Sequence, residues 1–75
     1  MNLTSKQRIV LLLLTNEWQT PIQIAGQLSK AGDLSDVQQA LKDLLKEGLV
    51  QTNPTVLGLY RLTPEGTAMK ESELS

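Results

Sequence analysis

The stretch Leu59-Tyr60-Arg61-Leu62-Thr63-Pro64-Glu65-Gly66 decides the fold of this chain. Its first half is typical of a short strand, with Leu59 and Arg61 on one face and Tyr60 and Leu62 on the other. Its second half has the pattern of a helix start, because Thr63 can cap the first turn and Pro64 suits the first helical position. The stretch therefore predicts a strand that runs directly into a helix.

Three earlier segments have the spacing of a helix start. At residues 4–7, 20–23 and 35–38, a threonine or serine stands three positions before a glutamine. In a capping box, the hydroxyl accepts a hydrogen bond from the third backbone N–H of the helix, and the glutamine bonds back to the cap. Pro21 strengthens the second start. The predicted helices cover about residues 5–16, 21–30 and 36–47.

Apolar residues recur at helical spacing in the second and third predicted helices, and this spacing assigns the faces that pack in the core. The inward-facing residues expected there are Ile22, Ala25, Leu28, Val37, Leu41, Leu44 and Leu45. The first helix differs, because residues 9–14 are apolar on every side of it. Such a helix is either packed on both sides within the domain or in contact with another subunit. The second alternative makes Val10, Leu11 and Leu14 a candidate dimer or partner surface.

After Gly48 the pattern changes from helix to short strands. Residues 49–52 form the first predicted strand, and residues 58–62 form the second. The segment Asn53-Pro54-Thr55 between them has the composition of a turn. Together these pieces predict a β-hairpin after the third helix.

The order of elements gives the fold class. Trp18 lies between the first two helices, where we expect a short strand and a packing role for the ring. The last helix starts at Pro64, and about residues 70–75 are expected to be a frayed tail. The chain is therefore predicted to be mainly α with a small β-hairpin (α+β). Two helices joined by a tight turn and followed by a hairpin make a winged helix-turn-helix.

Length and composition exclude several classes of protein. A chain of 75 residues is predicted to form one domain, over residues 1–75. It contains no His and no Cys, so the commonest metal ligands and the usual general base are absent. We therefore expect no metal or other cofactor, and no enzyme. The longest apolar run, residues 9–14, is too short to span a membrane, which favours a cytoplasmic protein.

Three motifs carry a resemblance to a known family. They are Thr20-Pro21-Ile22-Gln23-Ile24-Ala25, Leu41-Lys42-Asp43-Leu44-Leu45-Lys46-Glu47-Gly48-Leu49-Val50 and Tyr60-Arg61-Leu62-Thr63-Pro64-Glu65-Gly66. In this order the chain resembles the small winged-helix domains of bacterial regulators of the MarR and PadR type. The resemblance implies that the third helix enters the major groove of DNA and that the wing touches the backbone or minor groove. It also implies dimers that form through the first helix and extra C-terminal helices.

The third helix is the expected DNA reader. Gln38 and Gln39 lie near its start, and Lys42 follows one turn later. Glutamine can pair with adenine through two hydrogen bonds, and lysine can reach guanine acceptors or phosphate. The candidate DNA-binding residues are Gln38, Gln39, Lys42, Lys46, Arg61 and Lys30. The alternative for this face is an ordinary solvated helix surface.

The charge balance and the composition of the wing are less typical of a DNA-binding protein than the third helix is. The net charge is −1, and removing Glu71 and Glu73 of the predicted tail gives +1. The wing, residues 53–58, contains no Lys or Arg, so Arg61 is the nearest cation. Val56 and Leu57 in the wing are expected to tuck against the core. The alternative is an apolar patch for a protein partner.

Two functions follow from these observations. The first is a small DNA-binding transcriptional regulator, bacterial or phage, whose partners are double-stranded DNA and a second copy of the chain. The second is a protein–protein interaction module on the same scaffold, because a fold does not determine function by itself. Neither reading involves a membrane.

Overall fold

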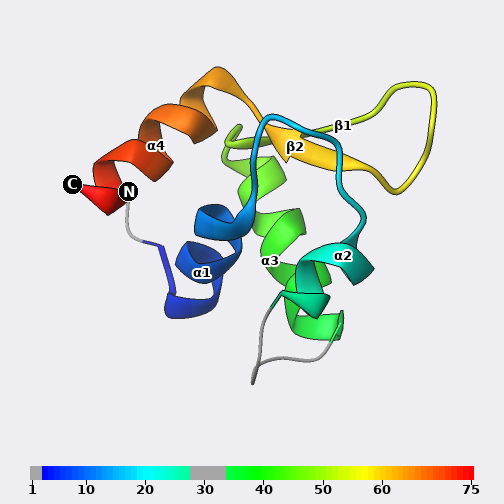
Figure 1. Ribbon diagram of the computed structural model, residues 1–75, viewed down its shortest axis with the longest axis horizontal. Helices are drawn as coiled ribbons and strands as arrows, with labels where there is room; N and C mark the ends of the chain where they lie inside the picture. Colours follow the sequence, from blue (N-terminus) through cyan, green and yellow to red (C-terminus); the bar gives the residue numbers. More distant parts are fainter. Residues whose placement is uncertain (1–2, 28–33) are drawn as a thin grey trace.

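The computed structural model describes residues 3–27 and 34–75 (Figure 1). The elements that it shows are α1 (Ser5–Leu13), α2 (Pro21–Gly26), α3 (Leu34–Lys46), β1 (Val50–Thr52), β2 (Tyr60–Leu62) and α4 (Pro64–Leu74). The strands form an antiparallel hairpin in which Val50 pairs with Leu62 and Thr52 with Tyr60. The predicted fold class, mainly α with a small hairpin in winged-helix order, is confirmed. No helix within the described residues is long and apolar enough to cross a membrane.

Two of the three predicted capping boxes are present. Thr4 and Thr20 each accept from the backbone N–H three residues later, at 3.1 Å, and Gln7 and Gln23 bond back to the cap. The third prediction is wrong. The helix α3 already begins at Leu34, so Ser35 lies inside its first turn and is not the cap.

Two helix ends also differ from the prediction. The helix α1 ends at Leu13, three residues early, because the chain turns extended at Leu14 and Thr15 then accepts from the backbone N–H of Leu62 at 3.0 Å. The helix α2 ends at Gly26. Its predicted last turn, with Leu28 and Lys30, lies outside the described residues.

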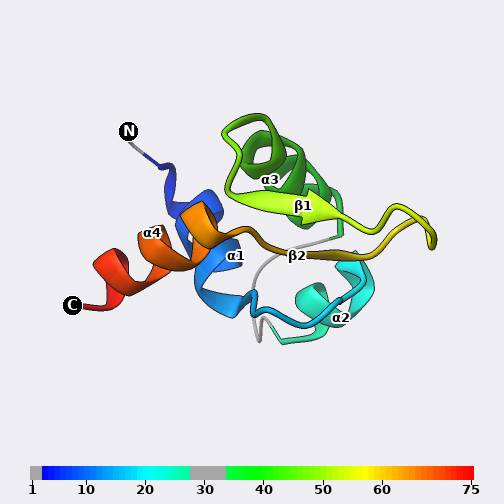
Figure 2. The same cartoon turned by 90° about the horizontal axis from the view of Figure 1, so that it is seen from above.

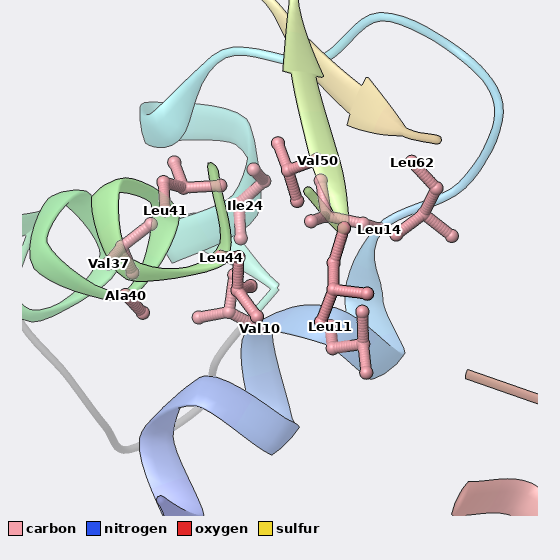
Figure 3. Close-up of a cluster of buried hydrophobic side chains, with 11 residues drawn as sticks. Val10, Leu11, Leu14, Ile24, Val37, Ala40, Leu41, Leu44, Val50 and Leu62 are labelled. Atoms are coloured by element: carbon pink, nitrogen blue, oxygen red, sulfur yellow. The ribbon is translucent and has the colours of Figure 1, made fainter. Parts of the chain in front are cut away.

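The core lies where α1, α2, α3 and the hairpin meet (Figure 3). Its buried side chains are Val10, Leu11, Leu14, Ile24, Val37, Ala40, Leu41, Leu44, Leu49, Val50 and Leu62. The prediction of a dimer or partner surface at Val10, Leu11 and Leu14 is therefore wrong. The helix α1 is apolar on several sides because it packs against α3 and also against α4.

Two predicted core positions are on the surface. Ile22 is 70% exposed, and Ile24 is the fully buried residue of α2. The helix α2 has only six residues, and the predicted core residue Ala25 packs against the core beside Ile24. On α3, Leu45 is 40% exposed, and Ala40 completes the buried stripe with Val37, Leu41 and Leu44.

The segment between α1 and α2 joins the hairpin. Gln19 and Tyr60 form an isolated antiparallel bridge, in which their backbone N–H and C=O groups exchange bonds of 2.8 and 2.9 Å. A single bridge replaces the short strand expected around Trp18. It ties the hairpin to the start of α2.

The hairpin continues into α4 through a tight junction. The Thr63 hydroxyl donates to the carbonyl of Gly48 at 2.7 Å and accepts from the N–H of Gly66 at 2.9 Å. The backbone N–H of Thr63 donates to the carbonyl of Leu49 at 3.1 Å. The predicted strand that runs directly into a capped helix is therefore confirmed.

The helix α4 continues to Leu74, so the predicted frayed tail is wrong. Glu73 forms an ion pair with Arg8 of α1, which holds the end of α4 against the body. The acidic side chains of α4 therefore belong to the folded domain, and the charge of the domain should be counted with them.

We predict that Gly66→Ala strongly destabilises the fold. A Cβ at this position would overlap with the backbone carbonyl of Leu49, and that carbonyl cannot move without breaking its bond from Thr63. Overpacking of this kind costs about 1–3 kcal/mol or more. Chemical denaturation would measure the loss. The matched control is Gly26→Ala, where a Cβ meets nothing within 4 Å; equal stability of the two variants would contradict the prediction.

Candidate nucleic-acid interface

The outward face of α3 carries four of the predicted DNA-binding residues. Gln38, Gln39, Lys42 and Lys46 are all exposed and project from the side of the helix opposite its buried stripe. They share this face because burying Val37, Ala40, Leu41 and Leu44 fixes the rotation of the helix about its axis. Lys42 and Lys46 form no ion pair with any other described residue. Their charges are available to a ligand.

This face forms one wall of a hollow of about 640 Å³. The start of α2 and the beginning of β2 supply the other walls. The lining residues are Thr20, Pro21, Ile22, Leu34, Ser35, Gln38, Gln39, Lys42, Gly58 and Tyr60. The sequence prediction missed the contribution of α2 and β2, although the motif at Thr20 and Pro21 had already marked the start of a helix there.

The acidic side chains of α3 are engaged by other residues. Asp36 forms an ion pair with Lys6 of α1 at 2.8 Å. The two carboxylate oxygens of Asp43 accept from Nε2 of Gln7, at 2.9 Å, and from Nε2 of Gln39, at 3.1 Å. Both acidic residues therefore lie on the α1 side of the helix, beside the exposed face and not in the middle of it.

Arg61 is not brought together with the other candidates. Its guanidinium carbon lies 4.3 Å from the centre of the Trp18 ring, a cation–π contact. Tyr60 lines the hollow beside α3, and Arg61, the next residue of β2, points to the opposite face of the hairpin. Arg61 therefore lines a different hollow, with Asn16, Thr67 and Glu71. Lys30, the remaining candidate, lies outside the described residues.

The wing tip projects from the body of the domain, as Figures 1 and 2 both show. The side-chain oxygen of Asn53 accepts from the backbone N–H groups of Thr55 and Val56, at 2.8 and 2.9 Å. Gly58 closes the loop with a φ of 87°. Val56 is 52% exposed and Leu57 is 93% exposed. The expectation that they tuck against the core is wrong, because the turn at Asn53 directs the tip outward.

Solved structures share this architecture, although no family model and no curated protein matches the sequence. Lactococcus lactis ZitR, a zinc-responsive MarR family member, is 29% identical and has a TM-score of 0.75. ZitR in complex with DNA is 28% identical, with a TM-score of 0.76, and the match covers 99% of this chain and 52% of ZitR. The chain has the winged-helix fold of the MarR family. It spans about half the length of ZitR.

A more distant structure agrees on the fold. The adhesin competence repressor AdcR of Streptococcus pyogenes is 21% identical, with a TM-score of 0.76 over 97% of this chain and 55% of AdcR. At this identity the likeness concerns the fold alone. ZitR and AdcR are transcriptional regulators rather than enzymes.

The zinc response of ZitR has no matching donor set in this sequence. The sequence contains no His and no Cys, which supply the nitrogen and sulfur ligands of most zinc sites. Within residues 3–27 and 34–75, no group of three or more acidic residues could hold a metal ion. These residues do not fit a zinc site.

We predict that Arg61 contributes to stability through Trp18. Replacing Arg61 by Ala removes the cation–π contact and should cost about 0.5–1 kcal/mol. Because Trp18 is the only tryptophan, its fluorescence should change in the same variant. The control is Lys42→Ala, a change on the exposed face of α3, which should alter neither signal. An Arg61→Ala variant with unchanged stability and fluorescence would show that the contact is absent in solution.

Proposed function

We propose that this chain binds double-stranded DNA as a transcriptional regulator, with α3 as the major-groove reader. The observation that carries the proposal is the face of Gln38, Gln39 and Lys42, exposed on the helix that follows α2 in a winged-helix fold. The likeness to ZitR in complex with DNA supports it, since that match includes 99% of the chain.

The side chains on this face have the chemistry for base edges and phosphates. The amide of a glutamine matches the N6 and N7 groups of adenine. Lys42 lies one turn further along, where its ammonium group can reach a guanine acceptor or a phosphate. Lys46 lies another turn along, and we assign it to the phosphate backbone. Lys6 and Arg8 are already paired with Asp36 and Glu73, which reduces their value as phosphate contacts.

The proposed complex makes few phosphate contacts, and its salt dependence should therefore be shallow. Each phosphate contact contributes about −0.9 to the slope of log K against log salt concentration. A domain of net charge −1, in which Lys42 and Lys46 on the outward face of α3 pair with no other described residue, gains little non-specific affinity. Specificity then requires a second reading helix, which favours a homodimer on DNA. The buried residues of α1 cannot supply the contact between the two copies.

We predict that Lys42→Ala weakens DNA binding by roughly ten-fold, as expected for loss of about 1.4 kcal/mol at a base or phosphate contact. The probe is a pool of duplexes with a randomised centre, selected with the unchanged protein at low salt. The matched control is Ser72→Glu on α4, which changes the net charge by the same amount away from α3. Failure of the unchanged protein to enrich any sequence would refute the proposal. Equal weakening by both variants would remove α3 from the reading role.

A second candidate function is a protein-interaction module, and the exposed wing tip favours it. Val56 and Leu57 offer apolar surface at a point where a DNA-binding wing usually carries positive charge. If a protein is the partner, Leu57→Ser should abolish a stoichiometric complex recovered by affinity capture. It should leave folding unchanged, because Leu57 is almost fully exposed. Under the DNA proposal, the same variant should retain the sequence preference of the unchanged protein.

A further inference from the structure

The hydrogen-bond cluster around Asp43 has a consequence for base recognition that depends on the proposed function. Asp43 lies at the edge of the reading face, where a negative charge opposes binding to phosphates. Its two carboxylate oxygens accept from Gln7 and from Gln39. An exposed pair four residues apart stabilises a helix only slightly. The bond from Gln7 joins α1 to α3 and serves the fold, whereas the bond from Gln39 adds little stability and leaves a role at the outward face of α3 open to it.

The chemistry of the carboxylate fixes the orientation of the Gln39 amide. An ionised carboxylate only accepts hydrogen bonds, so the group of Gln39 that faces Asp43 is the NH₂ group. The acceptor Oε1 of Gln39 therefore lies on the far side of the amide from Asp43. The terminal torsion of a glutamine is otherwise broad and roughly two-fold, so a glutamine without such a partner can present either end.

The orientation of the Gln7 side-chain amide is also fixed, in this case by two hydrogen-bond partners. Its Oε1 accepts from the backbone N–H of Thr4 at 3.0 Å, as part of the capping box of α1. Its Nε2 donates to Asp43 at 2.9 Å. The amide of Gln7 cannot turn over without breaking the capping box. Gln7 thus holds one oxygen of Asp43 and leaves the other for Gln39.

We propose that Asp43 sets the base preference of Gln39. It does so by holding the Gln39 amide with its acceptor oxygen facing the major groove of bound DNA. Adenine fits this orientation, because its N6 amine donates to Oε1 and its N7 accepts the second N–H of the Gln39 amide. Guanine does not fit, because its O6 and N7 are both acceptors. Asp43 and Gln7 are positioning residues that act through Gln39, and neither needs to touch DNA.

The variant Asp43→Asn tests this mechanism directly. Asparagine has one carbonyl oxygen and one NH₂ group, so it can accept from only one of the two glutamines in the present geometry. Because the capping box holds Gln7, Gln39 is the residue that turns its amide over. Its NH₂ group then faces the groove and matches the acceptors of guanine.

The experiment selects a duplex from a pool with a randomised centre, and then measures affinities for all single base-pair changes of that duplex. The unchanged protein should prefer adenine over guanine by roughly ten-fold at one base pair, the size of one two-bond contact. In Asp43→Asn, the preference at that base pair should move to guanine or disappear, with other positions unchanged. Gln39→Met, which keeps the length of the side chain without its polar groups, should lose the preference at the same base pair only.

The control is Lys46→Ala, which should weaken binding evenly across sequences and leave every base preference in place. The inference is overturned if Asp43→Asn keeps the adenine preference of the unchanged protein. It is equally overturned if Gln39→Met leaves all preferences intact. In both cases the unchanged protein still binds DNA, so the proposed function stands. Failure of the unchanged protein to bind any duplex would instead overturn the proposed function and this inference together.

Discussion

The close approach between the first turn of α4 and the backbone that leaves α3 is the constraint on which the remaining geometry depends. Gly48 takes a φ of 77° to end α3, and its carbonyl then accepts from the Thr63 hydroxyl. The same hydroxyl accepts from the N–H of Gly66, so one side chain satisfies backbone groups of two helix ends. Only glycine fits at position 66, beside the carbonyl of Leu49. The hairpin is held between these two ends, and its direction relative to α3 is therefore fixed.

The orientation of the outward face of α3 follows from the core and not from the polar residues themselves. The buried stripe of α3 packs against α1 and α2, and its helical period leaves Gln38, Gln39 and Lys42 on the opposite side. The bridge between Gln19 and Tyr60 adds a second restraint, because it ties β2 to the segment that leads into α2. The three walls of the hollow beside α3 are thus connected by backbone hydrogen bonds and by apolar contacts.

Local signals allowed the fold to be predicted, and long-range contacts explain the errors. The caps at Thr4, Thr20 and Thr63 depend on residues within the same turn, so sequence spacing reveals them. The burial of Ile24 in place of Ile22 depends on where a very short helix meets α3. The helix α4 up to Leu74 contacts the body through Met69, through the bond from Lys70 to the carbonyl of Leu14, and through the ion pair between Glu73 and Arg8, and no local pattern marks these contacts. In the site, the four-residue spacing of Gln39 and Asp43 is readable in the sequence, whereas the bond from Gln7 to Asp43 joins residues 36 positions apart.

The position of the charges matters more for the proposed site than their sum. Asp36 and Asp43 would oppose the proposed DNA binding if they lay in the middle of the outward face of α3, but Lys6 and Gln7 of α1 bind both at the flank of the helix. The end of α4, the helix that carries Glu71 and Glu73, lies on the side of the domain away from α2 and the wing (Figure 1). Exposed charges separated by more than about 8 Å are largely screened at physiological salt. On the described part of α3, Lys42 and Lys46 lie on the outward face and Asp43 at its edge, so a net charge of −1 is compatible with two cations on this face.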